Sequence, residues 1–173
     1  MWQNRRLIDL LKIEHPIVLS PMAGFGTIEL AAAVCAAGAL GSIGCGPTSA
    51  EIAARTIRQL RALTSKPINA NFFCHVPANV TTAHEQAWSV RLSHYHRELG
   101  SDPQSSLSRT NLPPFGHDMC TAVEQARPEV VSFHFGLPAP PLLSRVKAAG
   151  CFVMSSATTL SRRRGGSRPA ASM

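Results

Sequence analysis

The sequence predicts an α/β fold of parallel strand–helix units, and two observations support this prediction. Short apolar segments bounded by glycine or proline alternate with segments of helical periodicity along most of the chain. The connections between them are short in the first 73 residues, as is typical of βα units. A chain of 173 residues is also long enough to form a domain with a hydrophobic core. These patterns alone fit either a (β/α) barrel or a doubly wound sheet.

The first unit begins after a short amphipathic segment at residues 7–13. Residues 16–21 form an apolar segment bounded by prolines, which predicts a strand. The small residues of the turn that follows, 22–26, would let a ligand approach the backbone closely. Thr27 is a suitable N-cap for a helix over residues 28–37, which a glycine would close.

The next unit has the same plan. Residues 39–44 predict a second short strand. Thr48 or Ser49 would then open a longer helix, in which apolar residues recur at helical spacing up to Leu63. Residues 68–73 follow a proline and predict a third strand.

Residues 74–117 interrupt this rhythm. Thr82 and Glu85 have the spacing of a capping box, and a polar helix is expected up to about Leu99. Residues 100–114 are rich in serine, proline and asparagine and predict a loop. Because insertions of this size after a strand often cover a substrate site, we expect a helical, lid-like segment here. Two of its histidines are two positions apart and would not face each other on a helix, so no metal site is predicted.

Regular units return after the insertion. A helix is predicted over residues 118–125, a strand within 129–138, a helix over 140–149 and a fifth strand over 151–156. The strand within 129–138 carries His134 near its carboxyl end, where α/β proteins place their active sites. Side chains alternate between the faces of a strand. The two expected sets are Val130, Ser132 and His134 on one face and Val131, Phe133 and Phe135 on the other.

The composition excludes several classes of protein. The five cysteines are scattered and form no CxxC pair, which predicts neither a disulfide framework nor a zinc site. No segment is apolar and long enough to span a membrane, and no signal-peptide core is present, so a cytoplasmic protein is expected. The net charge of +7 is concentrated at positions 162–168, which hold four arginines. Because no basic stripe precedes them, we do not expect nucleic-acid binding.

Four segments together resemble the nitronate monooxygenase family, also called 2-nitropropane dioxygenases. The most specific segment is 131–138, with the sequence Val-Ser-Phe-His-Phe-Gly-Leu-Pro. The turn Ser-Pro-Met-Ala-Gly at 20–24 is shared with other flavin-binding barrels. The remaining two are the Lys-Pro…Asn-Phe-Phe pattern within 66–73 and Ser-Ala-Thr-Thr at 156–159.

The resemblance implies a TIM-type (β/α) barrel that binds FMN and oxidises alkyl nitronates with O₂ to a carbonyl compound and nitrite. By this resemblance, Met22, Ala23 and Gly24 would contact the flavin through their backbone, and Asn71 would hydrogen-bond it. His134 matches the active-site histidine of the family, which would act as a base or orient the nitro group. Histidine titrates near neutral pH, which suits proton removal from a carbon beside a nitro group.

The sequence departs from the family pattern at its end. A barrel of this type has eight βα units, whereas residues 1–160 supply about five. Residues 161–173 have no apolar periodicity and are typical of a disordered, basic tail. We therefore expect a C-terminally truncated member with an incomplete barrel, impaired FMN binding and open sheet edges that permit self-association. Another FMN-barrel oxidoreductase similar to an enoyl reductase, or a non-catalytic truncated remnant, remain alternatives.

Overall fold

The computed structural model describes residues 2–102 and 112–157, which fall into two compact units. Unit 1 takes in the described residues up to His75 and from Leu112 onward. Unit 2 takes in those from Val76 to residue 102. The predicted tail at 161–173 lies outside the described residues, as does most of the predicted loop at 100–114.

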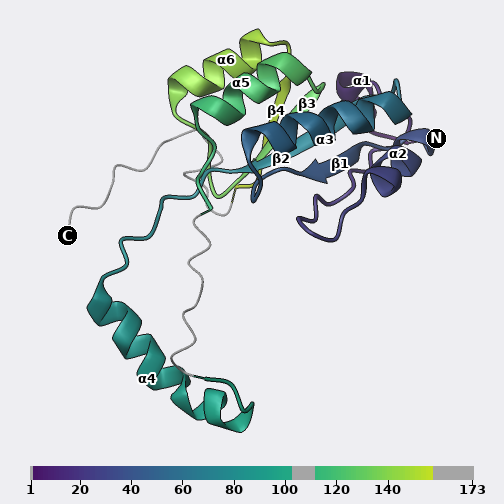
Figure 1. Ribbon diagram of the computed structural model, residues 1–173. Helices are drawn as coiled ribbons and strands as arrows, with labels where there is room; N and C mark the ends of the chain where they lie inside the picture. The colour runs from purple at the N-terminus through teal and green to yellow at the C-terminus, as the bar shows by residue number, and fades with distance from the viewer. Residues whose placement is uncertain (1, 103–111, 158–173) are drawn as a thin grey trace. The chain divides into compact units, whose positions relative to one another are not determined.

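Unit 1 is a parallel β-sheet whose strands alternate with helices (Figure 1). The four strands lie in the order β1-β2-β3-β4, and each pairs in parallel with the next, as the sequence predicts for an α/β fold. The strands are β1 Gly41–Gly44, β2 Ile68–Phe73, β3 Val130–His134 and β4 Phe152–Ser155. The helices of unit 1 are α1 Arg6–Leu11, α2 Ile28–Ala36, α3 Ala50–Leu63, α5 His117–Ala126 and α6 Pro140–Ala148.

The strand predicted at residues 16–21 is reduced to one bridge, between Val18 and Leu40. The Leu19 N–H donates to the Leu40 carbonyl at 2.9 Å, and the Leu40 N–H donates to the Ile17 carbonyl at 3.0 Å. The two flanking prolines have no N–H to extend this ladder. The part of the chain that is described therefore has four strands instead of the predicted five.

The predicted helix starts in unit 1 follow from local capping. The Thr27 hydroxyl accepts from the Leu30 N–H at 3.1 Å, as predicted. The Ser49 hydroxyl accepts from the Ile52 N–H at 3.3 Å, which decides between the two candidate caps of α3. Such a side-chain oxygen satisfies an amide that has no partner inside the helix.

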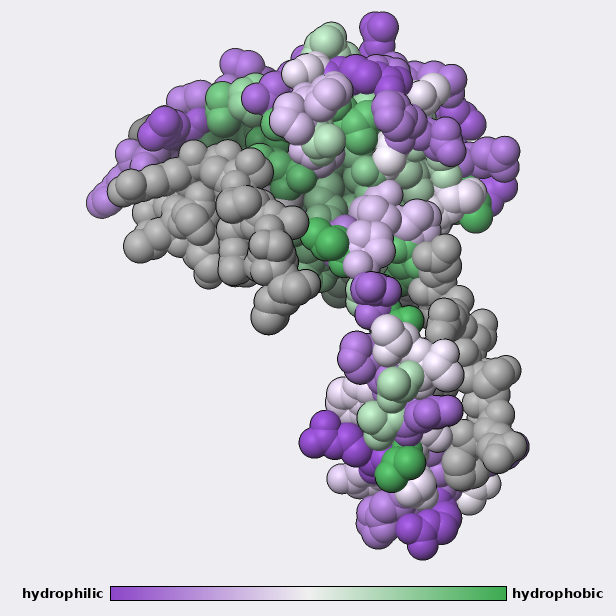
Figure 2. Space-filling view, turned by 90° about the vertical axis from the view of Figure 1, so that its left-hand side faces the viewer, coloured by the Kyte–Doolittle hydropathy of each residue, from purple (hydrophilic) through white to green (hydrophobic). Residues whose placement is uncertain are grey.

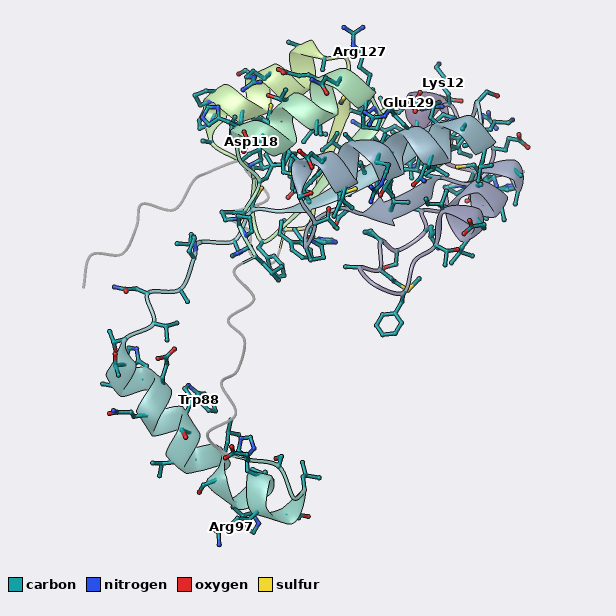
Figure 3. The ribbon with its side chains drawn as sticks, viewed as in Figure 1. Lys12, Trp88, Arg97, Asp118, Arg127 and Glu129 are labelled. Carbon is teal, nitrogen blue, oxygen red and sulfur yellow. The ribbon has the colours of Figure 1, made fainter. Side chains whose placement is uncertain are left out.

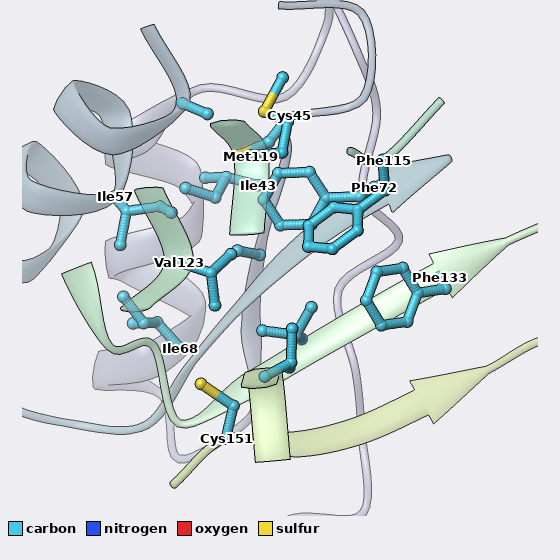
Figure 4. Close-up of a cluster of buried hydrophobic side chains, with 14 of the residues drawn as sticks. Ile43, Cys45, Ile57, Ile68, Phe72, Phe115, Met119, Val123, Phe133 and Cys151 are labelled. Atoms are coloured by element: carbon cyan, nitrogen blue, oxygen red, sulfur yellow. The ribbon is translucent and has the colours of Figure 1, made fainter. Parts of the chain in front are cut away.

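Helices α2, α3, α5 and α6 lie side by side over one face of the sheet. Their apolar side chains meet those of alternate strand residues, and Figure 4 shows this core. The Phe115 ring stacks edge-on against Phe72 and Phe133, with ring centroids 5.1 Å apart in each pair. Gly41 lets α2 approach closely, because a Cβ at this position would lie 2.2 Å from the Ala31 carbonyl oxygen. This face is fully apolar and carries no candidate site.

The opposite face of the sheet, here called the inner face, is closed at its amino end by the segment around α1. Leu11 and Ile13 form a second buried cluster there with Leu40 and Val130. Val130 thus lies on the face opposite to Val131 and Phe133, as the strand alternation predicts. Toward the carboxyl ends of the strands the inner face becomes polar.

Unit 2 consists mainly of α4, Thr82–Glu98, which Figure 3 shows with Trp88 and Arg97 labelled. The N-cap is Thr81, one residue before the predicted cap Thr82, because the Thr81 hydroxyl accepts from the His84 N–H at 3.3 Å. None of its side chains is buried, and the Arg91 guanidinium lies 5.6 Å from the Trp88 ring centroid. Its function as a lid stays a prediction.

Among the described residues, no helix is both long and apolar enough to cross a membrane. The same residues also contain no group of three or more His, Cys, Asp or Glu side chains that could hold a metal ion.

Candidate active site

The candidate site is a set of polar side chains on the inner face, arranged in successive rows across the strands. Residues in register on parallel strands project from the same face. In the first row, Ser42 of β1 lies beside Asn69 of β2. In the second row, Asn71 of β2 lies between Gly44 of β1 and Ser132 of β3. The last row pairs Phe73 with His134 at the carboxyl edge. Ser42, Asn69, Asn71 and Ser132 are the buried polar residues of the described chain.

Asn71 is 2% exposed and is held by Ser132 on the neighbouring strand. Its Nδ2 donates to the Ser132 hydroxyl at 3.0 Å and to the Ser132 carbonyl at 3.1 Å. Both amide protons are thus engaged, and the group that Asn71 can offer to a ligand is its carbonyl oxygen. The sequence did not single out Ser132 as a site residue, although its position two residues before His134 placed it on the correct face.

Asn69 and Ser42 form a second buried pair below Asn71. The Asn69 Nδ2 donates to the Ser42 hydroxyl at 2.9 Å, and both residues are 1% exposed. The Asn69 Oδ1 has no hydrogen-bond partner among the described residues. No local pattern predicts this pair, because the two residues meet only through the β1–β2 register.

His134 is the last residue of β3 and is half-buried. Its Nδ1 lies 2.9 Å from the hydroxyl oxygen of Ser156, just beyond β4. No described residue forms a hydrogen bond with its Nε2. The site therefore presents one imidazole nitrogen at the carboxyl edge of the sheet.

Phe135 does not continue the apolar face of β3, contrary to the prediction. Its backbone φ is +68°, in the left-handed region, and its side chain is 57% exposed. The strand ends at His134, and Gly136 follows with φ of +133°. This turn leaves the rings of Phe73 and Phe135 as apolar neighbours of His134, with centroids 6.5 Å and 6.3 Å away.

The turn at 22–26 packs against the carboxyl end of β1. A Cβ on Gly44 would lie 3.0 Å from the Ala23 nitrogen, so a larger residue here would require the turn to move by a few tenths of an ångström. Gly24 has φ of +82°, and the Gly26 N–H closes the turn on the Met22 carbonyl at 2.7 Å. Met22 and Gly24 are exposed. Within the described residues, no hydrogen bond joins this turn to Asn71 or His134.

Two cysteines follow the carboxyl ends of β1 and β2. Burial raises the pKa of Cys45 and that of Cys74 to about 12. A thiol with such a pKa stays protonated at neutral pH and is a poor nucleophile. The two cysteines are therefore part of the packing and are not candidate nucleophiles.

A separate pocket of about 750 Å³ lies in the N-terminal segment, lined by residues between Trp2 and Pro16. None of its lining residues belongs to the rows described above. Arg6 is the charged residue of its lining, which contains no histidine, cysteine or carboxylate. We therefore place the candidate site on the inner face.

A family model described as nitronate monooxygenase matches residues 4–165. The chain belongs to the nitronate monooxygenase family. A nitronate monooxygenase of Paraburkholderia phytofirmans is 44% identical over 158 residues, which are 91% of this chain and 43% of the relative. One of Pseudomonas aeruginosa is 40% identical over 156 residues, covering 89% of this chain and 44% of the relative. The chain thus spans less than half the length of these relatives.

Solved structures of the same fold are TIM-barrel enzymes. A nitroalkane oxidase from Streptomyces ansochromogenes has a TM-score of 0.72 and 30% identity, with 92% of this chain and 44% of the oxidase covered. FabK from Thermotoga maritima has a TM-score of 0.63 and 28% identity, with 92% of this chain and 39% of FabK covered. The four-stranded sheet is therefore a partial barrel, not a doubly wound sheet.

Proposed function

We propose that this chain carries part of a flavin-dependent site that oxidises alkyl nitronates with O₂ to a carbonyl compound and nitrite. The observation that carries the proposal is the position of His134 at the carboxyl edge of the sheet, where no described residue forms a hydrogen bond with its Nε2. Asn71 lies in the row below, where it is hydrogen-bonded to Ser132. Membership of the nitronate monooxygenase family supports this function over other uses of the same arrangement.

FMN is the cofactor that fits the residues present. A flavin ring offers N–H and carbonyl groups at its edge and a flat apolar face. The carbonyl oxygen of Asn71 can accept from a ring N–H, since its amide protons are already used by Ser132. Met22 and Gly24 are exposed and Ala23 is half-buried, so the backbone of this turn can lie against the ring. When bound, FMN would supply the redox chemistry, for which the protein provides position and hydrogen bonds.

His134 would act on the nitro group at its Nε2. With a proton on Nε2, the imidazole donates a hydrogen bond to a nitronate oxygen and stabilises the negative charge there. Without that proton, Nε2 accepts the proton of a carbon beside a neutral nitro group. The neighbouring rings of Phe73 and Phe135 present apolar surface suited to an alkyl chain.

The proposal is tested by nitronate-dependent O₂ uptake of the 173-residue chain with FMN in large excess. We expect uptake accompanied by nitrite, and at least a tenfold loss for His134→Asn, because removal of a positioned acid or base typically costs about 10²–10⁴-fold. His15→Asn, the same change at an exposed histidine outside the rows of the site, serves as a matched control. Equal rates for wild type and His134→Asn would refute the assignment.

A second candidate is an FMN-barrel oxidoreductase similar to an enoyl reductase. The structural likeness to FabK, at a TM-score of 0.63, favours keeping this candidate. The two functions differ in their electron donor, since only the second requires NAD(P)H. NAD(P)H oxidation in the absence of nitronate would support the second candidate. A chain that gives neither activity and no flavin spectrum would be a non-catalytic remnant.

A further inference from the structure

Ser156 contacts the candidate catalytic histidine from a different strand. Its hydroxyl oxygen lies 2.9 Å from the His134 Nδ1, and the two residues are 22 positions apart in the chain. The Ser156 N–H donates to the Phe133 carbonyl at 3.3 Å, which continues the β3–β4 ladder past Ser155. The sheet itself therefore fixes the backbone from which this hydroxyl reaches the imidazole.

We propose that Ser156 is a positioning residue that holds the His134 ring by Nδ1 and directs Nε2 toward the substrate. The functional part of this inference rests on the proposed function. Its structural part, the hydroxyl–imidazole contact, stands on the geometry alone. No residue of the described chain places a carboxylate against the ring, so the hydroxyl is the partner that sets its orientation.

The chemistry of a hydroxyl makes this pair suited to two classes of substrate. A hydroxyl both donates and accepts, whereas a carboxylate only accepts. When Oγ–H donates to Nδ1, Nε2 carries the proton and can donate to an anionic nitronate. When Nδ1–H donates to Oγ, Nε2 is a base for a neutral nitroalkane. In that case the carbon-bound proton moves to Nε2, the electron pair stays on the nitronate, and the imidazolium Nδ1–H still donates to Oγ.

Ser155 provides a matched control one residue away. Its hydroxyl donates to the Gly136 carbonyl at 3.2 Å, and it forms no hydrogen bond with the His134 ring within the described residues. Both serines are exposed, so alanine is expected to be tolerated at either position. Threonine at position 156 keeps a hydroxyl and serves as the conservative variant.

The test is ¹⁵N NMR of the histidine side chains in the flavin-free 173-residue chain. His134→Asn identifies the two ring-nitrogen signals by their loss. We expect Ser156→Ala to shift the Nδ1 signal of His134 and change its tautomer ratio, Ser156→Thr to restore them, and Ser155→Ala to leave them unchanged. Unchanged His134 signals in Ser156→Ala would overturn the proposal. If the alanine variant does not fold, Ser156→Cys, whose thiol is a weak partner, is expected to shift the same signals.

These outcomes separate this inference from the proposed function. The NMR measurement needs neither flavin nor substrate, so it can succeed even if nitronate oxidation is never observed. With activity in hand, Ser156→Ala should lower turnover of both nitronates and neutral nitroalkanes, and Ser156→Thr should recover both. Loss of activity without a change in the NMR signals would assign Ser156 a different part in the site.

Discussion

At the scale of single residues, the inner face combines two buried asparagines that differ in one respect. Asn71 is held by two hydrogen bonds to Ser132, and its carbonyl oxygen is the group left for a ligand. Asn69 has one bond, to Ser42, and its own carbonyl oxygen has no partner within the described residues. A buried acceptor without a donor lowers the stability of the folded state. The hydrogen bond to Ser42 limits this cost, because it satisfies the other polar group of the Asn69 amide.

Replacement of Ser42 by alanine should therefore destabilise the protein. The change removes the partner of the Asn69 Nδ2 and leaves a second unpaired polar group in the sheet, at a cost of about 1–3 kcal/mol. Urea unfolding followed by circular dichroism measures the difference. The double variant Ser42→Ala with Asn69→Val removes both polar groups and should recover much of the loss. A double variant less stable than Ser42→Ala would contradict this account.

At the scale of elements, α5 and α6 are joined on the outer layer by a bidentate ion pair. The Arg145 Nε donates to the Glu124 Oε1 at 2.8 Å, and its Nη2 donates to the Oε2 at 2.7 Å. The hydrogen bond from Arg145 lowers the pKa of Glu124 below its ordinary value. Both side chains remain about one-third exposed, so the pair is partly screened by solvent.

This pair predicts a pH-dependent part of the stability. Because the folded-state pKa of Glu124 is lowered, its contribution is fully present above the pKa of the unfolded state and is lost as the pH falls through the folded-state value. Wild type should therefore be more stable than Glu124→Gln at pH 7, and the difference should disappear in acid. The same Glu124→Gln change in an Arg145→Gln background, where the ion pair is already broken, should show no such trend. Chemical unfolding at a series of pH values provides the comparison.

At the scale of the whole molecule, no strand among the described residues pairs with the outer edge of β4. This strand is the last in the order, and its Phe152 is 42% exposed. Figure 2 also shows hydrophobic residues gathered on the visible face of unit 1, and the exposed set includes Phe25, Phe135 and Leu137. An open, apolar edge favours pairing with another chain, and self-association through it stays a prediction.

FMN binding depends on how many strands of the barrel are present. Phosphate sites in TIM barrels usually come from the loops after strands 7 and 8, whereas the described residues form four strands. We therefore expect the 173-residue chain alone to hold FMN weakly. Gel filtration of the protein after incubation with FMN should strip the flavin absorbance from the protein peak. A stoichiometric flavin signal in that peak would show that the residues around Asn71 and the 22–26 turn suffice for binding.

Much of the architecture was predictable because its signals are local. The cap at Thr27, a cap at Thr48 or Ser49, and the strand at 68–73 depend on residues a few positions apart and were predicted from the sequence. Residues 16–21 failed as a full strand for an equally local reason, since prolines at both ends withhold N–H donors. The alternation of β3 correctly separated His134 and Ser132 from Val131 and Phe133, although it did not foresee the left-handed turn at Phe135.

By itself, the sequence determined the α/β class, the family and His134 as the candidate catalytic residue. Only the tertiary structure decided which groups His134 and Asn71 contact. Ser156 is 22 residues from His134, and Ser132 is 61 residues from Asn71. These partners meet because the strands pair in one register, and a shift by one residue would turn every one of these side chains to the other face. Register depends on packing between distant segments, which no local pattern in the chain records.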